Sequence, residues 1–307
     1  MLKPIPKRVL VTGENGQVGQ SLKAMAQNYP QFAFYFAGRE QFDLASDDTI
    51  KLFFSAQVFD AIIHCAAYTA VDKAESEPAL ANQINHLAVA HIAKLAKEQN
   101  ALLIYLSTDY VFDGRASQPY DEAAQTCPIN LYGQTKRDGE RAIIAANPSA
   151  LIVRTSWVYT KYGHNFVNTM LKLGRQRDEL NVIYDQIGTP TYAPDLAAAI
   201  LVMLNAELVG SSLEGLQSEK RTDKNVSIFH YTNEGVCSWY DFAQAVFEMA
   251  AIPCRLQPIE SLAYPTPAQR PGYSLLSKAR IKQAYGLQIP HWRESLARCL
   301  LYQGKRI

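Results

Sequence analysis

The stretch that decides the fold is Arg8-Val9-Leu10-Val11-Thr12-Gly13-Glu14-Asn15-Gly16-Gln17-Val18-Gly19. Its first five residues predict a short strand, and glycines follow at three-residue intervals. Glycine permits a sharp turn and lets backbone N–H groups approach a pyrophosphate at the positive end of the next helix. The position of this Gly-x-x-Gly-x-x-Gly loop in the first βα unit favours dinucleotide binding over the alternative, a glycine-containing turn with nothing bound.

The alternation of strand and helix continues through the first half of the chain. This order is typical of an α/β doubly wound parallel sheet with helices on both faces. The strands are expected at 8–12, 32–36, 61–65, 102–107 and 151–155, and the helices at 17–28, 47–56 behind a Ser46 cap, 78–99 and 132–146.

The second half of the chain is less regular, and we expect a smaller C-terminal α/β domain there. We expect an NAD(P)-binding Rossmann-like domain over 1–157, also receiving about 181–207, and a mainly substrate-binding domain over 158–307. The proline-rich segment 264–272 suits neither a helix nor a central strand, so it is either an ordered loop lining a site or a surface linker. Further elements are expected as helices at 166–177, 194–204 and 239–251 (capped by Ser238), strands at 182–184 and 226–231, and a polar loop or insertion at 210–225.

The composition is that of an ordinary globular protein. The 307 residues are 48% hydrophobic and 19% charged, with a net charge of +1, which argues against a nucleic-acid or membrane surface. The apolar runs are too short for a signal peptide or a membrane span, so we expect a cytoplasmic protein, with a homodimer as one possible assembly.

Neither the cysteines nor the histidines have the spacing of a metal site. The five cysteines are scattered without a Cys-x-x-Cys pair, so we expect small buried hydrophobic residues and no disulfide framework or zinc site. His86 and His91 are five residues apart, not the three or four that would align them on a helix, and no metal is expected.

Tyr132 and Lys136 are four residues apart on an expected helix, so they project from one face. An ammonium near a phenol lowers the pKa of the phenol toward the range in which it passes a proton near neutrality. A Tyr and a Lys at this spacing also occur by chance, so the context decides.

That context is residues 107–114, which follow the fourth expected strand and begin Ser107-Thr108-Asp109-Tyr110. Ligands of a doubly wound sheet lie beyond the carboxyl ends of its strands. We therefore expect the Thr108 hydroxyl and the Tyr132 phenol to reach the same carbonyl oxygen. The alternative is that Ser107 and Thr108 only cap a turn.

Two segments bear on the adenosine half of a dinucleotide. Ala66 and Ala67 follow the third strand and are small enough for a flat ligand to lie close, although packing against a helix would explain them too. The end of the second strand carries Arg39 and no acid, which predicts NADPH over NADH, since an acid there normally binds the ribose hydroxyls. Glu40 and Asp43 follow closely, however, and Arg39 as a solvated surface charge is the alternative.

Taken in order from residue 13 to residue 272, these motifs resemble the dTDP-4-dehydrorhamnose reductase family of extended short-chain dehydrogenases. The resemblance implies hydride transfer from NADPH, or NADH, to C4 of dTDP-4-dehydro-L-rhamnose. It implies Tyr132 as the acid, Lys136 as its partner and ribose ligand, and Thr108 as the hydroxyl that orients the carbonyl. Its motifs are the glycine loop, 66–75, 107–114, 132–136, 154–159, 185–191 and 270–272.

The resemblance also implies which residues line the two ligands. This chain departs from the family pattern at two places: His64 stands where Asn is more usual, and the segment 210–225 is unusual. The cofactor residues are expected to be Gly13, Gly16, Gln17, Val18, Gly19, Arg39, Asp43, Leu44, Ala66, Ala67, Thr69, Tyr132 and Lys136. The substrate residues are expected to be Thr108, Asp109, Trp157 (packed on the sugar), Gln186, Thr191 and Arg270.

Three other functions share this fold. Sugar-nucleotide dehydratases carry an Asp-Glu pair after the threonine of the fourth strand, whereas Asp109 and Tyr110 follow Thr108 here. The non-catalytic β subunit of methionine adenosyltransferase has a similar Tyr–Lys motif, but Trp157 and residues 185–191 resemble the sugar-binding enzyme instead. Another sugar-nucleotide epimerase or reductase is the remaining alternative.

Overall fold

The computed structural model describes residues 5–210 and 225–301. Its centre is a six-stranded sheet in the order β10-β5-β4-β3-β1-β2, in which every neighbouring pair is parallel. The expected doubly wound α/β fold is confirmed. The strands are β1 (Lys7–Thr12), β2 (Phe32–Ala37), β3 (Ala61–His64), β4 (Leu102–Thr108), β5 (Ala150–Thr155) and β10 (Val226–His230).

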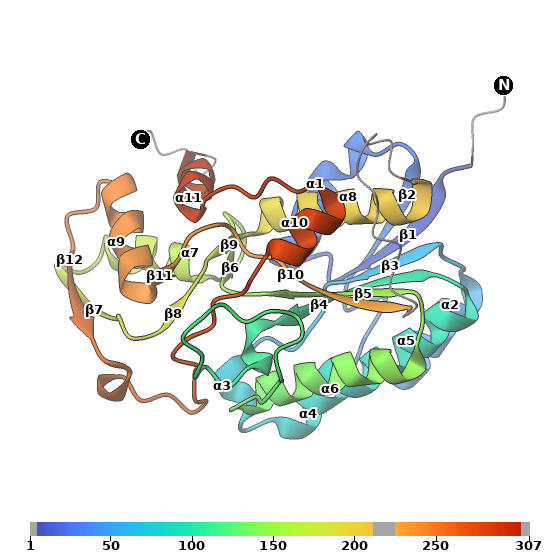
Figure 1. Cartoon of the computed structure of the whole chain (residues 1–307), viewed down its shortest axis with the longest axis horizontal. Coiled ribbons are helices and arrows are strands. Elements are labelled where there is room, and N and C mark those ends of the chain that lie inside the picture. Colours follow the sequence, from blue (N-terminus) through green and yellow to red (C-terminus); the bar gives the residue numbers. More distant parts are fainter. Residues whose placement is uncertain (1–4, 211–224, 302–307) are drawn as a thin grey trace.

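Helices cover both faces of this sheet, as Figure 1 shows. Because side chains of a strand alternate between faces, Val9 and Val11 join one core while Leu10 joins the other. One face is covered by α1 (Gln17–Met25), α8 (Ala193–Val209) and α10 (Ala279–Tyr285), and the other by α2 (Asp47–Ala56), α5 (Ala88–Glu98) and α6 (Leu131–Ala146).

A third core lies at the other end of the molecule, on the left in Figure 1. It is built from short strand pairs and helices around Phe242 and Trp292. The pairs are β6 (Val158–Tyr159) with β9 (Thr191–Tyr192), β7 (Glu179–Ile183) with β12 (Arg255–Ile259), and β8 (Ile187–Gly188) with β11 (Cys237–Ser238). The helices are α7 (Phe166–Leu173), α9 (Trp239–Met249) and α11 (Trp292–Leu301).

Several expected boundaries were wrong. The helix expected over 78–99 is α4 (Pro78–Asn82), a π-helical turn η2 (Gln83–Leu87) and then α5. Helix α1 ends at Met25 and continues as a 3₁₀ turn, η1 (Ala26–Asn28), while α7 stops at Leu173, before Gly174. The strand expected at 182–184 begins earlier, at Glu179. Of the polar loop expected at 210–225, residues 211–224 lie outside the described part of the chain.

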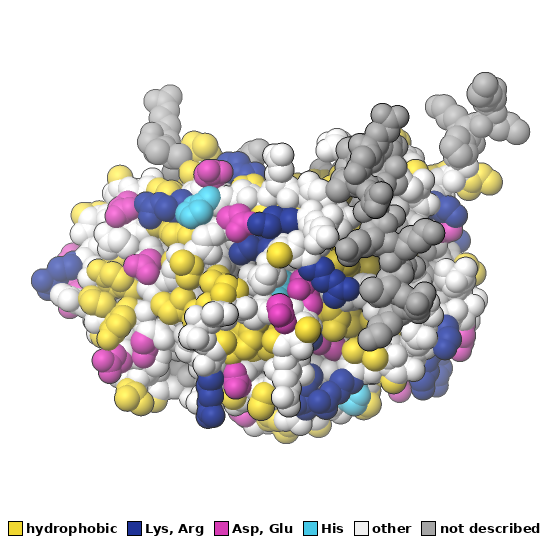
Figure 2. Space-filling view, viewed as in Figure 1, with side chains coloured by type: hydrophobic (Ala, Val, Ile, Leu, Met, Phe, Trp, Pro, Cys, Tyr) yellow, Lys and Arg dark blue, Asp and Glu magenta, His cyan; other side chains and the backbone are white. Residues whose placement is uncertain are grey.

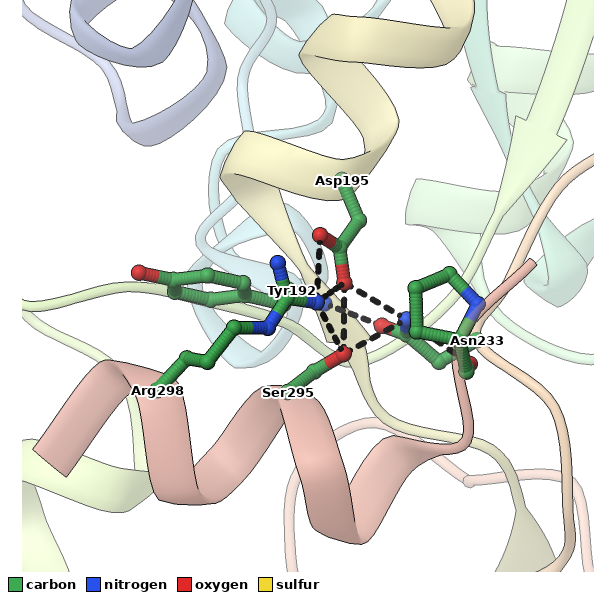
Figure 3. A network of polar contacts seen from close by, with 6 residues as sticks. Tyr192, Asp195, Asn233, Ser295 and Arg298 are labelled. Atoms are coloured by element: carbon green, nitrogen blue, oxygen red, sulfur yellow. Dashed lines mark hydrogen bonds and ion pairs between the residues drawn. The ribbon is translucent and has the colours of Figure 1, made fainter. Parts of the chain in front are cut away.

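A buried polar network fastens the C-terminal helix α11 to the start of α8 (Figure 3). Asp195 accepts hydrogen bonds from Asn233 Nδ2 at 2.8 Å and from Arg298 Nη2 at 2.8 Å. Asn233 in turn accepts from the backbone N–H of Tyr192 at 2.7 Å, and Ser295 donates to Asp195. Because Tyr192 belongs to β9, the network also fixes the strand pair β6–β9, which carries candidate substrate residues.

Figure 2 shows acidic and basic side chains mixed over one face of the described chain, as the near-zero net charge predicts. The described residues contain no helix long and apolar enough to cross a membrane.

Candidate active site

The glycine loop between β1 and α1 has the shape that a dinucleotide needs. Gly13 has φ +73°, and a Cβ there would lie 2.8 Å from the backbone nitrogen of Ala66. A Cβ on Gly19 would overlap the Gly13 carbonyl oxygen. The loop therefore packs directly on the segment after β3, and larger residues at these two positions would force it open.

The N-terminal end of α1 has room for an anion. Gly16 is the N-cap and offers no capping side chain, and the first turn holds no acid. Helix N–H groups and the helix dipole at such an end favour phosphate groups. The loop and the helix together fit the pyrophosphate of a dinucleotide.

Gln17 has a different use from the expected one. Its Nε2 donates to the Val158 carbonyl at 3.1 Å, and its Oε1 accepts from Asn165 Nδ2 at 3.0 Å. The side chain thus ties the glycine loop to β6 and α7. Since the side-chain amide of Gln17 is engaged within the protein, its backbone N–H at the start of the helix is the group that can bind a phosphate. Val18 is buried in the sheet core.

The residues expected at the adenosine end lie at the end of β2. Arg39 Nε is 3.6 Å from Asp43 Oδ1, and the Arg39 side chain is 78% exposed. Leu44 belongs to the sheet core. Glu14, which the sequence analysis passed over, brings its carboxylate to Gly38, where a Cβ would lie 2.9 Å from Glu14 Oε1, and pairs with Lys23 at 3.2 Å.

After β3, a hydrogen-bond chain holds the alanine segment. Thr12 Oγ1 accepts from Ala66 N at 3.3 Å and lies 2.8 Å from His64 Nδ1. Burial, with the charge of Lys136, lowers the pKa of His64 to about 3, so the imidazole is neutral and shares a hydrogen bond with the Thr12 hydroxyl. His64 thus supports the loop. Ala67 is partly exposed and Thr69 is exposed.

Helix α6 presents Tyr132 and Lys136 to the carboxyl end of β4. Asn130 caps the helix by accepting from Gly133 N at 2.8 Å. Gly133 has no Cβ, and one there would overlap the Tyr110 carbonyl oxygen. The helix start therefore packs tightly on η3 (Asp109–Val111), with the rings of Tyr110 and Tyr132 edge to face at 5.7 Å.

The phenol of Tyr132 is a protonated acid at neutral pH. Burial raises its pKa to about 12; the charge of Asp109 acts in the same direction, and the hydrogen bond with Thr108 opposes both. Thr108 Oγ1 donates to Asp109 Oδ1 at 2.9 Å and accepts from Tyr110 N at 3.2 Å. The Thr108 hydroxyl thus links the Tyr132 phenol to the Asp109 carboxylate through hydrogen bonds.

Lys136 is one of the largest fully buried side chains. Burial lowers its pKa to about 7, against the charge of Glu140, which raises it. Its ammonium donates to the Leu106 carbonyl at 2.7 Å and lies 4.1 Å from the centre of the Tyr105 ring. The expected net lowering of the Tyr132 pKa is wrong for this structure, because desolvation dominates and shifts both groups toward their neutral forms.

Asp109 is buried beside these groups, and burial raises its pKa to about 6. Its Oδ2 has no hydrogen-bond partner within the described part of the chain, although the Ser274 hydroxyl is near enough to oppose the shift. A buried carboxylate oxygen without a partner is costly, so a hydroxyl group of a ligand is a suitable partner for it.

Trp157 has an unusual backbone. Its φ is +49°, in the left-handed region. Its indole stacks on Trp239, with ring centroids 3.6 Å apart and planes at 13°. The left-handed conformation of a bulky residue is strained and is often found at ligand sites.

The other three expected substrate residues have partners within the protein. Thr191 is fully buried, accepts from Thr155 Oγ1 at 3.3 Å and donates its N–H to Trp157 O, so its side chain has no surface open to a ligand here. Gln186 is buried and donates to Ser261 Oγ at 3.0 Å. Arg270 forms a bidentate ion pair with Asp72.

Sequence reasoning also missed a buried ion pair beneath the catalytic helix. Glu140, one turn after Lys136, accepts from Arg154 Nε at 2.9 Å and Nη2 at 2.7 Å, and from Ser107 Oγ. Both charged side chains are 3% exposed. The spacing Lys136 to Glu140 was the available signal, since a Glu on the inward face of a helix needs a buried cation.

All five cysteines are free; Cys237, Cys254 and Cys299 are buried, Cys65 is partly exposed and Cys127 is exposed. No group of three or more metal-ligating side chains occurs in the described segments.

Comparison with known proteins shows the family of this chain. A family described as "RmlD substrate binding domain" matches residues 7–303. The dTDP-4-dehydrorhamnose reductase of Sinorhizobium fredii is 42% identical over 305 residues, covering 97% of this chain and 99% of the relative. That of Escherichia coli is 39% identical over 300 residues, covering 95% and 96%.

Among solved structures, the dTDP-4-dehydrorhamnose reductase of Bacillus anthracis in complex with NADP superposes with a TM-score of 0.88 at 35% identity, covering 97% of this chain and 100% of that one. The family match and these relatives each span nearly the full length. The chain therefore belongs to the family described as the RmlD substrate binding domain, whose members named here are dTDP-4-dehydrorhamnose reductases.

Proposed function

We propose that this chain reduces the C4 keto group of dTDP-4-dehydro-L-rhamnose, giving dTDP-L-rhamnose, with Tyr132 as the acid. The activity is that of its full-length relatives. The observation that carries the catalytic assignment is that the Thr108 hydroxyl reaches the Tyr132 phenol at the carboxyl edge of the sheet, with Lys136 one turn further along the same helix. Ligands of doubly wound sheets bind at that edge.

The cofactor is NADP(H), which the solved Bacillus anthracis relative carries as NADP. Gly13, Gly16 and Gly19 make room for its pyrophosphate at the start of α1, and Arg39 is the cation available for a 2′-phosphate. When bound, the reduced nicotinamide supplies the hydride. Lys136 is proposed to hold the nicotinamide ribose.

The proton comes from the protein. Tyr132 is protonated at neutral pH because its pKa is about 12, and it donates to the C4 oxygen as negative charge develops there. A cationic Lys136 nearby stabilises the phenolate that remains. Thr108 orients the carbonyl oxygen, and Asp109, through Oδ2, accepts from a sugar hydroxyl.

The sugar is proposed to pack on Trp157, because an aromatic ring offers a large apolar surface to a sugar. Thr191 acts indirectly, because it holds the Trp157 carbonyl. Gln186 lines the same side, and Arg270 fastens the proline-rich segment through Asp72.

The direct test is to incubate the purified chain with NADPH and dTDP-4-dehydro-L-rhamnose and to follow the loss of reduced-nicotinamide absorbance, with dTDP-L-rhamnose identified by chromatography. The control substrate is dTDP-glucose, which has no keto group. Stoichiometric NADPH oxidation is expected only with the keto sugar. An epimerase would convert sugars without net oxidation, and a regulatory subunit would bind NADPH without turnover; either result would contradict the proposal.

A cytoplasmic location and a homodimeric assembly remain predictions. Light scattering on the purified chain measures the assembly, and cell fractionation the location.

A further inference from the structure

We propose that Trp239 is a positioning residue: it holds the indole of Trp157 in its stacked orientation so that this ring can receive the sugar. The inference rests on the proposed placement of Trp157 against the sugar. In the proposed mechanism Trp239 contacts neither the hydride donor nor the C4 carbonyl. Three features of the structure support its role.

The first is the backbone of Trp157. A φ of +49° is a conformation that a bulky side chain seldom adopts without help from its neighbours. The Trp157 carbonyl accepts from Thr191 N at 3.1 Å, which fixes the next peptide. This hydrogen bond does not restrain the side-chain torsions of Trp157, so another contact has to determine the orientation of its indole.

The second is the stack itself. The two indoles lie 3.6 Å apart between ring centroids, with planes at 13°, so one whole face of Trp157 is covered by Trp239. Phe166 of α7 supports Trp239 from another side, at 4.6 Å. Trp239 is also the first residue of α9, whose start is fixed by a capping box between Ser238 and Asp241. Trp239 is therefore held by two helices and cannot easily move away.

The third is the space given by Gly188. A Cβ there would lie 3.0 Å from Cε2 and Cζ2 of Trp157, and 2.9 Å from the Ser274 hydroxyl. Gly188 pairs with Cys237 in the β8–β11 ladder, two residues before Trp239. One small sheet thus carries Gly188, whose backbone lies close to the Cε2–Cζ2 bond of the Trp157 indole, and leads into Trp239, which covers one face of that indole (these elements gather on the left in Figure 1).

A sugar that packs on Trp157 must then use the part of the ring that neither Trp239 nor Gly188 covers. Without Trp239, the indole gains other rotamers, and binding has to select one of them. Substrate affinity should fall, whereas proton transfer from Tyr132 should not change. A residue needed only for folding would not separate these two effects.

The experiment compares steady-state kinetics of the wild type with Trp239→Ala, Trp239→Phe and Trp157→Ala. We expect Trp239→Ala to raise the KM for the sugar nucleotide about three- to ten-fold, the range of an aromatic pair. Its kcat should change less than about twofold and its KM for NADPH not at all. Trp239→Phe should restore most of the affinity, because a smaller aromatic ring still covers the Trp157 face.

Near-ultraviolet circular dichroism gives a readout independent of activity, since a stacked indole pair produces a coupled signal. Trp292→Phe is the matched control, because the Trp292 ring lies in the same core and contacts the rings of Phe242 and His291. The coupled signal should vanish in Trp239→Phe and Trp157→Ala and persist in Trp292→Phe. Gly188→Ala should raise the KM as well, since its Cβ displaces the indole.

The outcomes separate this inference from the proposed function. If Trp157→Ala raises the KM while Trp239→Ala and Trp239→Phe leave it unchanged, the positioning role is wrong and the sugar-binding role of Trp157 stands. If Trp157→Ala leaves the KM unchanged, the placement of the sugar is wrong, and this inference fails with it. Should Trp239→Ala not fold, Gly188→Ala decides: loss of the coupled signal in that variant with an unchanged KM overturns the inference.

Discussion

Arg270 and Asp72 form a bidentate ion pair, with Nη1 and Nη2 at 3.0 and 2.8 Å from the two carboxylate oxygens. The guanidinium holds the pKa of Asp72 below its usual range, and Asp72 also accepts from Ala268 N. The two residues are 198 positions apart in the chain. The proline-rich segment is therefore fastened to the residues after β3, which favours an ordered loop over a surface linker; that the loop lines the site stays a prediction.

Breaking this pair should loosen the loop without unfolding the protein. We expect Asp72→Asn to raise the KM for the sugar nucleotide several-fold, and to change stability by no more than about 1 kcal/mol because the pair is partly exposed. Arg255→Lys, at an exposed pair with Glu179, is the control and should change neither. Wild-type KM in Asp72→Asn would show that the loop does not shape the site.

The buried ion pair Glu140–Arg154 should contribute more to stability than the partly exposed pair Arg270–Asp72. Removing one partner leaves an uncompensated buried charge, so Glu140→Gln should destabilise the fold by about 3–5 kcal/mol. Glu140→Leu combined with Arg154→Met should recover much of this loss. Urea unfolding measures both, and a double variant no more stable than the single one would argue against the charge as the cause.

The pKa of Lys136 predicts how activity depends on pH. It is lowered by burial to about 7, so in the free protein the ammonium is present below that pH and is lost above it. Since the cationic form stabilises the Tyr132 phenolate, kcat/KM should fall as pH rises through about 7, while Tyr132, with a pKa of about 12, stays protonated. A profile that is flat between about pH 6 and 9 would contradict this role.

Cofactor choice is tested at Arg39. If it binds the 2′-phosphate, Arg39→Ala should lower the ratio of kcat/KM for NADPH over NADH by about tenfold, near the low end for a charge-assisted bond because the side chain is exposed. Glu14→Gln should raise the same ratio, since Glu14 lies beside Gly38 and repels a phosphate. Equal ratios in Arg39→Ala and the wild type would remove Arg39 from selection.

The sequence predicted the parallel sheet and the approach of Thr108 to Tyr132 because these depend on local signals. Hydrophobic periodicity marks strands and helices, and the carboxyl ends of parallel strands share one edge. The same reasoning placed the Ser46 cap and the start of α2 correctly.

What it missed depends on contacts between distant residues. Glu14 reaches Gly38, Trp239 stacks on Trp157, and Arg270 pairs with Asp72 only once the chain has folded. The direction of the Tyr132 pKa shift was wrong for the same reason, because burial of the phenol has no local signal in the sequence. Short strands such as β8 and β11 lack a period long enough to detect.

Tyr132 is the proposed proton donor, and the variant Tyr132→Phe tests this assignment most directly. With NADPH and dTDP-4-dehydro-L-rhamnose, kcat should fall by roughly 10²–10⁴, because the proton donor is removed while the ring and its contact with Tyr110 remain. NADPH affinity, measured by nucleotide fluorescence, and the unfolding midpoint should stay at their wild-type values. A variant that keeps more than half of the wild-type turnover would contradict the assignment of Tyr132 as the acid.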